Sequence, residues 1–329
     1  MQLIHYPKVS VIILNWNGLG YIEKCLDSVL ASNYPKELLE VIVVDNGSSD
    51  GSIEVIRKYY PEVRLIENKS NLGFCIGNNI GIKNSTGDLV ILLNNDTIVD
   101  KDWIINIVRE AGDSKVGIIG CILVNPVTNR IQTLGCKELF TCFWESIGHG
   151  KIFSRKINVG GKEVDYVSGA ALAIKREVLR KIGLLDPLFH SYVEDVDLCY
   201  RAKRAGYKVV MSNAIVYHYK SLSWSMLPIK KLYLVYRNKT LFIIKNYKRA
   251  ALIKYFLKYP IQVTFHYLKR APLYLTDYNN ARFIFLKRVK NYLFNLFFFY
   301  LGIALGLRLA KLVASNCDVH DGGLETHIS

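Results

Sequence analysis

The stretch Val9-Ser10-Val11-Ile12-Ile13-Leu14-Asn15-Trp16-Asn17-Gly18 decides the fold. Its first six residues are almost all apolar and mostly β-branched, which is typical of a buried strand, and polar residues and a glycine follow at once. Further apolar runs lie at 41–44, 63–66 and 89–93, separated by stretches of helical period such as 21–31 and 52–60. Buried strands that alternate with helices predict an α/β fold with a parallel sheet covered on both faces.

Polar residues gather where three of these strands end. Asn15-Trp16-Asn17-Gly18 follows the first strand, Asp45-Asn46-Gly47-Ser48-Ser49-Asp50 the second, and Asn94-Asn95-Asp96-Thr97 the fourth. In parallel sheets of this kind, ligands bind beyond the carboxyl ends of the strands. We therefore expect a ligand site at this edge of the sheet.

Each candidate residue also has a structural interpretation. Asp45 can accept hydrogen bonds from a nucleobase or ribose, or it can cap a tight turn. Asp96 suits a divalent cation that neutralises a leaving diphosphate, with Asn94 offering only a neutral amide, or the two form an ordinary turn. His218 ends an apolar strand and is either a ligand or a structural histidine. Asn71-Leu72-Gly73-Phe74 opens a helix that ends near residue 85, and it either lines a sugar or base pocket or makes a tight turn.

Glu194-Asp195-Val196-Asp197 places three carboxylates within four residues. Like charges this close raise one another's pKa, so they occur together mainly where a helix N-terminus, a cation or a proton-accepting role compensates. A helix first turn rich in acids is the structural alternative. Asp197 is expected to orient the loop or to pair with Arg201, four residues further on.

The elements around this acidic cluster are also predicted. We expect a strand at 164–174, a helix at 176–182, a helix at 196–205 that Gly206 ends, and strands at 208–211 and 215–219. The preceding segment, 125–161, is Gly-rich and aromatic. We interpret it as an insertion on the side of the site where a second substrate, the acceptor, would bind.

The positive charge of the chain lies in its last third. The 329 residues carry 43 Lys and Arg against 28 Asp and Glu, a formal net charge of +15. Between residues 229 and 311 there are 17 basic residues and one acid, Asp277, so the rest of the chain is nearly neutral. Basic helices rich in Tyr and Phe lie at the surface of anionic membranes. We therefore expect this region to associate with a membrane, and 314–329 to form a polar, disordered tail.

The run 291–307, between Lys290 and Arg308, is at the short limit for a spanning helix. An in-plane or re-entrant helix is favoured over a full span, and a helical subdomain packed on the catalytic part is the structural alternative. Nucleic acid is not an expected partner, because binding through this basic patch would leave many apolar aromatic side chains exposed.

Cysteine usage and the N-terminus point to the inside of the cell. The seven cysteines show no Cys-x-x-Cys pairing and no His spacing suited to zinc, so we expect reduced, mostly buried thiols. The apolar run at 9–14 is too short for a signal peptide. We therefore expect the catalytic part to stay in the cytosol.

Taken together, these segments resemble the inverting glycosyltransferases of family 2 with the GT-A fold, in particular a rhamnosyltransferase-like branch that extends lipid-linked glycans. The resemblance covers about residues 8–223 and rests on the quoted segments, on Gly169-Ala170-Ala171 and on Leu198-Cys199 after the acidic cluster. It implies a Rossmann-like nucleotide-sugar-binding domain, 1–226, followed by an amphipathic helical membrane-associating region, 227–313, and the tail, 314–329.

The resemblance also implies roles for single residues. Asp195 would be the catalytic base, with Glu194 as the second candidate, and Asp96 would bind a divalent cation, Mg²⁺ or Mn²⁺, with His218 as a further contact to the metal or the diphosphate. Asp45 would contact the base or ribose of the nucleotide-sugar. The other donor-side residues would be Asn15, Asn17, Asn46, Asn71, Gly73, Asn94 and Asn95. Asn94 departs from the family pattern, because the first Asp of an Asp-x-Asp motif often stands there.

We therefore expect inverting transfer of one sugar, with rhamnose as a candidate, from a nucleotide-sugar to a glycan or polyprenyl-diphosphate-linked acceptor. The protein would be peripheral or monotopic at the cytoplasmic face of the cell membrane. The Gln-x-x-Arg-Trp motif of processive polysaccharide synthases is absent, which favours single addition. The alternatives are a nucleotide-sugar-binding membrane scaffold without turnover and a nucleotide-dependent oxidoreductase. The latter needs Gly-x-Gly-x-x-Gly after the first strand, where Asn15-Trp16-Asn17-Gly18-Leu19-Gly20 stands.

Overall fold

The computed structural model describes residues 6–140, 143–219 and 228–248, together with residues 255, 257, 258, 300, 304 and 308. The chain divides into two compact units, one of Met1–Leu139 with Trp144–Leu222 and one of Phe140–Phe143 with Ser223–Ser329. The first unit holds every candidate site residue named above. The expected tail, 314–329, and most of the run 291–307 lie outside the described residues.

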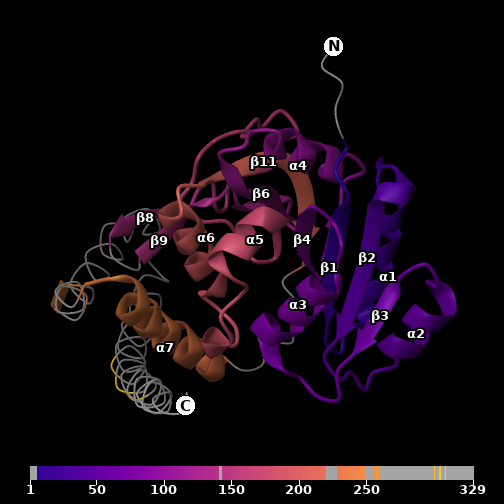
Figure 1. Ribbon diagram of the computed structural model, residues 1–329, viewed down its shortest axis with the longest axis horizontal. Coiled ribbons are helices and arrows are strands. Elements are labelled where there is room, and N and C mark those ends of the chain that lie inside the picture. Colours follow the sequence, from indigo (N-terminus) through magenta and orange to yellow (C-terminus); the bar gives the residue numbers. More distant parts are fainter. Residues whose placement is uncertain are drawn as a thin grey trace, which may run out of the picture. The chain divides into compact units, whose positions relative to one another are not determined.

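Nine strands within the described residues form one mixed sheet, in the order β3-β2-β1-β4-β10-β6-β11-β5, with β7 paired to β6 (Figure 1). The strands are β1 (Val9–Asn15), β2 (Leu39–Asp45), β3 (Arg64–Glu67), β4 (Leu89–Asn94), β5 (Thr97–Val99), β6 (Val116–Asn125), β7 (Arg130–Thr133), β10 (Ala171–Lys175) and β11 (Lys208–His218). A separate two-stranded sheet pairs β8 (Cys136–Phe140) with β9 (Phe143–Ser146).

Helices cover both faces of the large sheet. They are α1 (Leu19–Leu30), α2 (Ser52–Tyr59), α3 (Gly73–Asn84), α4 (Trp103–Ala111), α5 (Arg176–Ile182) and α6 (Glu194–Arg204), with 3₁₀ turns at Lys36–Leu38 and Pro187–Phe189. Figure 1 shows α1 and α2 on one side of β1 and β2 and α3 on the other. This arrangement explains the apolar composition of the strands, because both of their faces are buried.

The first four strands agree with the sequence prediction. β3, β2, β1 and β4 run parallel to one another. Val9, Val11 and Ile13 belong to the main apolar core, which includes residues of α1 and α2. Ile12 points to the opposite face, where a Cβ on Gly81 of α3 would collide with its side chain. Glycine at that position therefore allows α3 to lie close against β1.

The second half of the sheet differs from the prediction of a parallel sheet. β10 runs antiparallel to both β4 and β6. The described residues between β6 and β10 contain no helix that could serve as a crossover, and a parallel strand needs one. The predicted strand 164–174 is regular only from Ala171, because the chain before it makes isolated bridges, such as Cys136 with Tyr166.

Two further predictions are corrected around the acidic cluster. The strands expected at 208–211 and 215–219 form one strand, β11, whose pairing with β6 shifts register between Met211 and Ile215. At this shift Ser212 Oγ donates to the carbonyl of Gly120 at 2.8 Å. The helix at 176–182 is confirmed, and α6 begins two residues before the expected 196, so that it includes Glu194 and Asp195.

The second unit contains α7 (Pro228–Asn246), a helix of 19 residues. Among the residues that the structure describes, no helix is long and apolar enough to cross a membrane. Most of the expected membrane-associating region, 227–313, lies outside the described residues. In the described part, Cys25, Cys75, Cys121, Cys136 and Cys199 are free and buried, as predicted, whereas Cys142 and Cys317 are not described.

Candidate active site

Asn15 ties together the carboxyl ends of β1, β2 and β4. Its buried side chain donates from Nδ2 to Asp45 Oδ2 at 2.8 Å and to Ser52 Oγ at 2.9 Å. Its Oδ1 accepts a hydrogen bond from Asn95 Nδ2 at 2.7 Å. A Cβ on Gly18 would collide with both amide side chains, so glycine is needed there for this contact. The structure thus brings predicted donor-side residues of three strands into one hydrogen-bonded group.

Asp45 holds the loop that follows β2. Its Oδ1 accepts from the backbone N–H of Ser48 at 2.8 Å, and its Oδ2 accepts from Ser48 Oγ at 2.6 Å. The tight turn that was the structural alternative is therefore present. A carboxylate has about four acceptor positions, and with the bond from Asn15 three of them are used. The fourth, on Oδ1, would have to be uncovered before Asp45 could accept a ligand hydrogen bond, because Asp45 is 0% exposed.

Asn17 and Ser48 connect the first two strand ends on the exposed side. The backbone N–H of Asn17 donates to Ser48 Oγ at 2.8 Å, and Asn17 Oδ1 accepts from the N–H of Ser49 at 2.9 Å. Asn17 is exposed and has a positive φ of 49°, which asparagine tolerates better than most residues. Its amide nitrogen therefore lies where a ligand can reach it.

Asn46 connects the loop after β2 to the start of α3. Its Nδ2 donates to the carbonyl of Gly73 at 3.2 Å and lies 3.5 Å from Asn71 Oδ1. Asn71 Oδ1 accepts the N–H of Gly73 at 2.9 Å, which closes the turn that opens the helix. Asn46 is buried and Asn71 is exposed. Of this group, Asn71 can meet a ligand directly, while Asn46 holds the two segments together.

Asp96 and His218 meet although they lie far apart in the sequence. β5 and β11 pair antiparallel, which sets His218 opposite Thr97, next to Asp96. His218 Nε2 lies 3.2 Å from Asp96 Oδ1, and the residues are only 8% and 4% exposed. On the other side of the ring, Nδ1 lies 3.0 Å from Gln132 Oε1. The two predicted metal residues are thus neighbours.

This pair fits a divalent cation. Two ligands at adjacent corners of an octahedral ion with bonds of about 2.1 Å are about 3.0 Å apart, close to the observed separation. One carboxylate oxygen and one imidazole nitrogen are both donors that Mn²⁺ accepts, and Mg²⁺ favours the oxygen. No group of three or more His, Cys, Asp or Glu side chains suited to a metal occurs in the described part of the chain. A cation held here would need ligands beyond these two side chains.

Asp195 lies in the first turn of α6 and is held by backbone N–H groups. Its Oδ2 accepts from Gly169 at 2.9 Å, and its Oδ1 accepts from Val196 at 2.8 Å. The residue after Gly169, Ala170, accepts the N–H of Asn94 at 2.9 Å. Two successive residues therefore link the acidic cluster to the strand end that carries the Asn94-x-Asp96 pair.

The two adjacent acids differ in what stabilises their charge. Burial and then the charge of Asp195 raise the pKa of Glu194 well above its ordinary value. Burial also raises the pKa of Asp195, but the N–H groups of Gly169 and Val196 oppose this shift. Within the described residues, Glu194 Oε2 has no hydrogen-bond partner. Backbone N–H groups of two other residues thus favour the charged form of Asp195.

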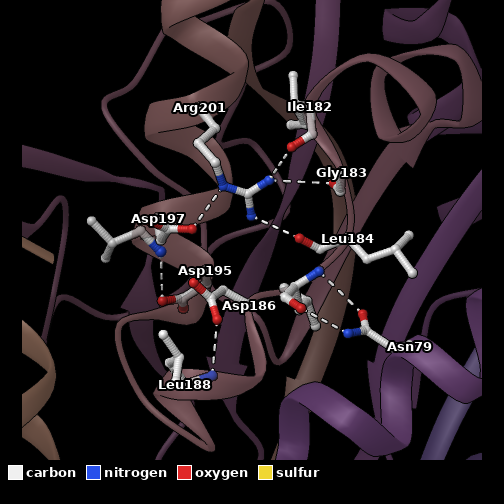
Figure 2. Close-up of polar contacts among 11 residues, drawn as sticks. Asn79, Ile182, Gly183, Leu184, Asp186, Leu188, Asp195, Asp197 and Arg201 are labelled. Carbon is white, nitrogen blue, oxygen red and sulfur yellow. Dashed lines mark hydrogen bonds and ion pairs between the residues drawn. The ribbon is translucent and has the colours of Figure 1, made fainter. Parts of the chain in front are cut away.

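Arg201 fixes the chain that leads to the acidic cluster (Figure 2). Its Nε donates to the fully buried Asp197 at 2.7 Å, which confirms the expected pairing. Its guanidinium also donates to the carbonyls of Ile182 at 2.5 Å and Leu184 at 2.8 Å. From the opposite side, Asn79 of α3 bonds to both the N–H and the carbonyl of Leu185. The loop after α5 is therefore held by two helices.

The turn between this loop and α6 has an unfavourable backbone. His190, Tyr192 and Val193 have φ values of 60°, 72° and 71°, a region that non-glycine residues, and β-branched ones above all, rarely adopt. The carbonyl of His190 accepts the N–H of Cys75 at 3.1 Å, so α3 helps to hold the turn. Strain of this kind persists only where surrounding contacts enforce it, and it is common at functional sites.

Sequence reasoning missed several residues that build this site. Gln132, the partner of His218, lies in the segment that was interpreted only as an acceptor-side insertion. Asn79 lies in a quoted motif, but its bonds to Leu185 could not be foreseen. The only sequence signal for Arg201 is its spacing of four from Asp197, which says nothing of the carbonyls that it also binds.

The sequence matches a known family over more than half of its length. Residues 10–183 match the model described as Glycosyl transferase family 2. Glycosyltransferase AglE of Haloferax volcanii is 34% identical over 117 residues, which are 35% of this chain and 38% of that protein. N-acetylglucosaminyl-diphospho-decaprenol L-rhamnosyltransferase of Mycobacterium tuberculosis is 24% identical over 291 residues, 80% of this chain and 94% of that protein. Six of the curated relatives are matched over only 18% to 50% of their own length.

Solved structures show the same fold. The mannosyltransferase PcManGT of Pyrobaculum calidifontis, in complex with GDP-Man and Mn²⁺, has a TM-score of 0.58 at 18% identity, covering 95% of this chain and 88% of that one. Staphylococcus aureus TarS with UDP-GlcNAc has a TM-score of 0.53 at 18% identity, covering 74% and 68%. The fold is thus an α/β, GT-A-like fold with a mixed sheet. The family expected from the sequence is confirmed, and the chain belongs to glycosyl transferase family 2.

Proposed function

We propose that the protein transfers a single sugar, with inversion, from a nucleotide-sugar to an acceptor hydroxyl, and that Asp195 is the base. The observation that carries this proposal is the anchoring of the Asp195 carboxylate by two backbone N–H groups, directly linked to the strand end that carries Asp96. In the reaction, Asp195 takes the hydroxyl proton while the acceptor oxygen bonds to the sugar and the sugar–diphosphate bond breaks. Because this is one displacement, the anomeric configuration inverts.

On the donor side, the edge formed by β1, β2 and β4 would bind the nucleotide. Asp45 would accept a hydrogen bond from the base or ribose through its remaining acceptor position, and the exposed amides of Asn17 and Asn71 would contact polar donor atoms. Asn15, Asn46 and Asn95 would keep this edge in shape. When bound beside Asp96 and His218, a divalent cation would neutralise charge on the leaving diphosphate.

A lipid-linked acceptor is the finer part of the proposal. The Mycobacterium tuberculosis relative, which spans 80% of this chain, is named for an N-acetylglucosaminyl-diphospho-decaprenol acceptor and for L-rhamnose. The basic, aromatic region after residue 227 suits an anionic membrane surface, where such an acceptor resides. Rhamnose, the lipid-linked acceptor and the cytoplasmic membrane face are therefore proposed together.

A donor screen tests the activity. Nucleotide-sugars that raise the thermal unfolding midpoint identify the donor, because a ligand that binds only the native state stabilises it. That donor, labelled in its sugar, is then incubated with polyprenyl-diphosphate-linked acceptors, and the anomeric configuration of the product is read by NMR. We expect one added sugar with inverted configuration. A retained configuration would contradict the single displacement, and stabilisation by a donor with no transfer to any acceptor would favour the scaffold alternative.

The membrane and metal components have separate tests. Removing the residues after 227 should release the protein from anionic liposomes in a sedimentation assay, and a truncated protein that still sediments would refute the anchor. Chelation of divalent ions should suppress transfer, and added Mn²⁺ should restore it. An unchanged rate after chelation would remove the cation from the proposal but leave Asp195 in place.

A further inference from the structure

Gln132 and His218 are joined by two hydrogen bonds. Gln132 lies on β7 and is 7% exposed. Its Nε2 donates to the backbone carbonyl of His218 at 2.6 Å, and its Oε1 lies 3.0 Å from Nδ1 of the same residue. A carbonyl can only accept, so the amide nitrogen must face it, and the amide oxygen must then face the ring. The orientation of Gln132 is therefore fixed by the backbone of the residue that it contacts.

The fixed amide in turn determines the tautomer of His218. A glutamine oxygen can only accept, so Nδ1 of the ring must carry the hydrogen. In the neutral imidazole the lone pair is then on Nε2, the atom that lies 3.2 Å from Asp96 Oδ1. The other tautomer would direct an N–H at the carboxylate, and this hydrogen bond would occupy both the ring nitrogen and the oxygen that a cation needs.

We propose that Gln132 is a positioning residue of the cation site, which holds His218 with its Nε2 lone pair directed at an ion beside Asp96. This inference rests on the proposed function, because it takes Asp96 and His218 as the cation ligands. Histidines that bind metals usually donate their other ring N–H to a second partner, and loss of that partner weakens metal binding by about 10- to 100-fold.

The position of Gln132 in the fold supports this role. β7 pairs antiparallel with β6, and β6 pairs parallel with β11, whose last residue is His218. The backbone carbonyl of Gln132 accepts a hydrogen bond from Nδ1 of His149 at 2.9 Å. The side chain thus starts from a strand that is fixed in the sheet, and its contact with the ring does not depend on a mobile surface group.

The test compares Mn²⁺ binding, measured by titration calorimetry, in the full-length protein and four variants. Gln132→Met keeps the size of the side chain and removes both hydrogen bonds, and we expect it to weaken Mn²⁺ binding by about 10- to 100-fold. Gln132→Glu keeps an acceptor opposite Nδ1 and should bind Mn²⁺ more tightly than Gln132→Met. The matched control is Thr133→Val, the next residue of β7 and 6% exposed, whose hydroxyl bonds to Gly135 and not to His218. It should bind Mn²⁺ like the wild type.

The fourth variant, Asp96→Asn, separates this inference from the proposed function. If Asp96→Asn weakens Mn²⁺ binding and Gln132→Met does not, the cation site stands and the role of Gln132 is overturned. If the wild type and Asp96→Asn bind Mn²⁺ equally well when the nucleoside diphosphate of the identified donor is also present, the proposed cation ligands are wrong.

Nitrogen chemical shifts of ¹⁵N-histidine-labelled protein without metal give a second readout that needs no bound ion. We expect a hydrogen on Nδ1 of His218 in the wild type and in Thr133→Val, whether or not Nε2 also carries one toward Asp96, and its loss in Gln132→Met. A wild-type ring protonated on Nε2 alone would overturn the inference whatever the binding data show.

Discussion

The donor edge and the acidic cluster are built in different ways, although they lie side by side in one site. At the donor edge, Asn15, Asp45 and Asn95 stand at the ends of regular strands, and the register of a parallel sheet brings them together. Before the acidic cluster, three of four successive residues, His190, Tyr192 and Val193, have positive φ, and an N–H group of α3 bonds to this turn. The comparison teaches that the geometry of the acidic cluster depends on contacts from distant helices, whereas the strand ends of β1, β2 and β4, here called the donor edge, depend on the sheet.

The largest expected effect is at Asp195, the proposed base. Asp195→Asn keeps the shape of the side chain but cannot take a proton, so transfer should fall by about 10²- to 10⁴-fold. Nucleotide binding, measured by calorimetry, should remain, because the donor edge is separate from the acidic cluster. Full turnover in this variant would show that another group is the base.

The next effect concerns Arg201, which holds the loop before the acidic cluster. Arg201→Met leaves the buried carboxylate of Asp197 without its cation and leaves the carbonyls of Ile182 and Leu184 without their donor. Loss of one partner of a buried ion pair costs about 3–5 kcal/mol, and since Arg201 is 21% exposed we expect about 3 kcal/mol in the free energy of unfolding, measured with denaturant.

Arg57→Met is the matched control for this substitution. Arg57 pairs with Glu67 at the end of β3, but the two side chains are 59% and 38% exposed, so the loss should be below about 1 kcal/mol. Equal losses of unfolding free energy in the two variants would show that the contacts of Arg201 stabilise the fold no more than an exposed ion pair does.

A smaller effect is expected at the donor edge. Asn15→Leu removes the buried hydrogen bonds of Asn15 to Asp45 and Asn95. This loss should lower the free energy of unfolding by about 1–3 kcal/mol. It should also weaken nucleotide binding. Asn33→Leu removes an exposed bond to Asp102 and should change stability by at most about 0.5 kcal/mol. If both variants lose the same stability, the buried group does not hold the strand ends together.

The smallest effect is on the pH dependence of stability. The pKa of Glu194 is raised in the folded state above its unfolded value of about 4.3, so the stabilisation present below that pH is lost as the pH rises through the folded pKa. Glu194→Gln cannot ionise and should show a smaller fall of the unfolding midpoint as the pH rises above the unfolded value. The exposed Glu54→Gln should follow the wild-type curve, and a Glu194→Gln curve that also follows it would mean that Glu194 is ionised without cost.

Much of the donor edge could be predicted because local patterns encode it. Buried parallel strands are apolar along their whole length, so the runs around Val11, Val43 and Ile91 and the polar residues after them can be recognised directly. The helix Arg176–Ile182 was also predicted with its observed limits. The antiparallel direction of β10 could not be predicted, because strand direction depends on how the chain returns to the sheet.

The contacts that complete the site carry no comparable local signal. Gln132 reads as an ordinary polar residue, and only the pairing of β7 with β6 and of β6 with β11 brings it to His218. Asn79 reads as part of a glycine- and asparagine-rich helix start, and only the packing of α3 brings it to Leu185. Such contacts join segments far apart in sequence, so periodicity does not reveal them.

The sequence by itself determined the family, the parallel strands and the residue types of the donor edge, because each of these depends on neighbours within a few positions. Only the tertiary structure decided which of the two adjacent acids accepts hydrogen bonds from the backbone N–H groups of Gly169 and Val196, how the turn before them is held, and which side chain contacts the ring of His218. The physical reason is that the charge of a carboxylate and the tautomer of an imidazole depend on the donors and acceptors around them, and folding brings these together from distant parts of the chain.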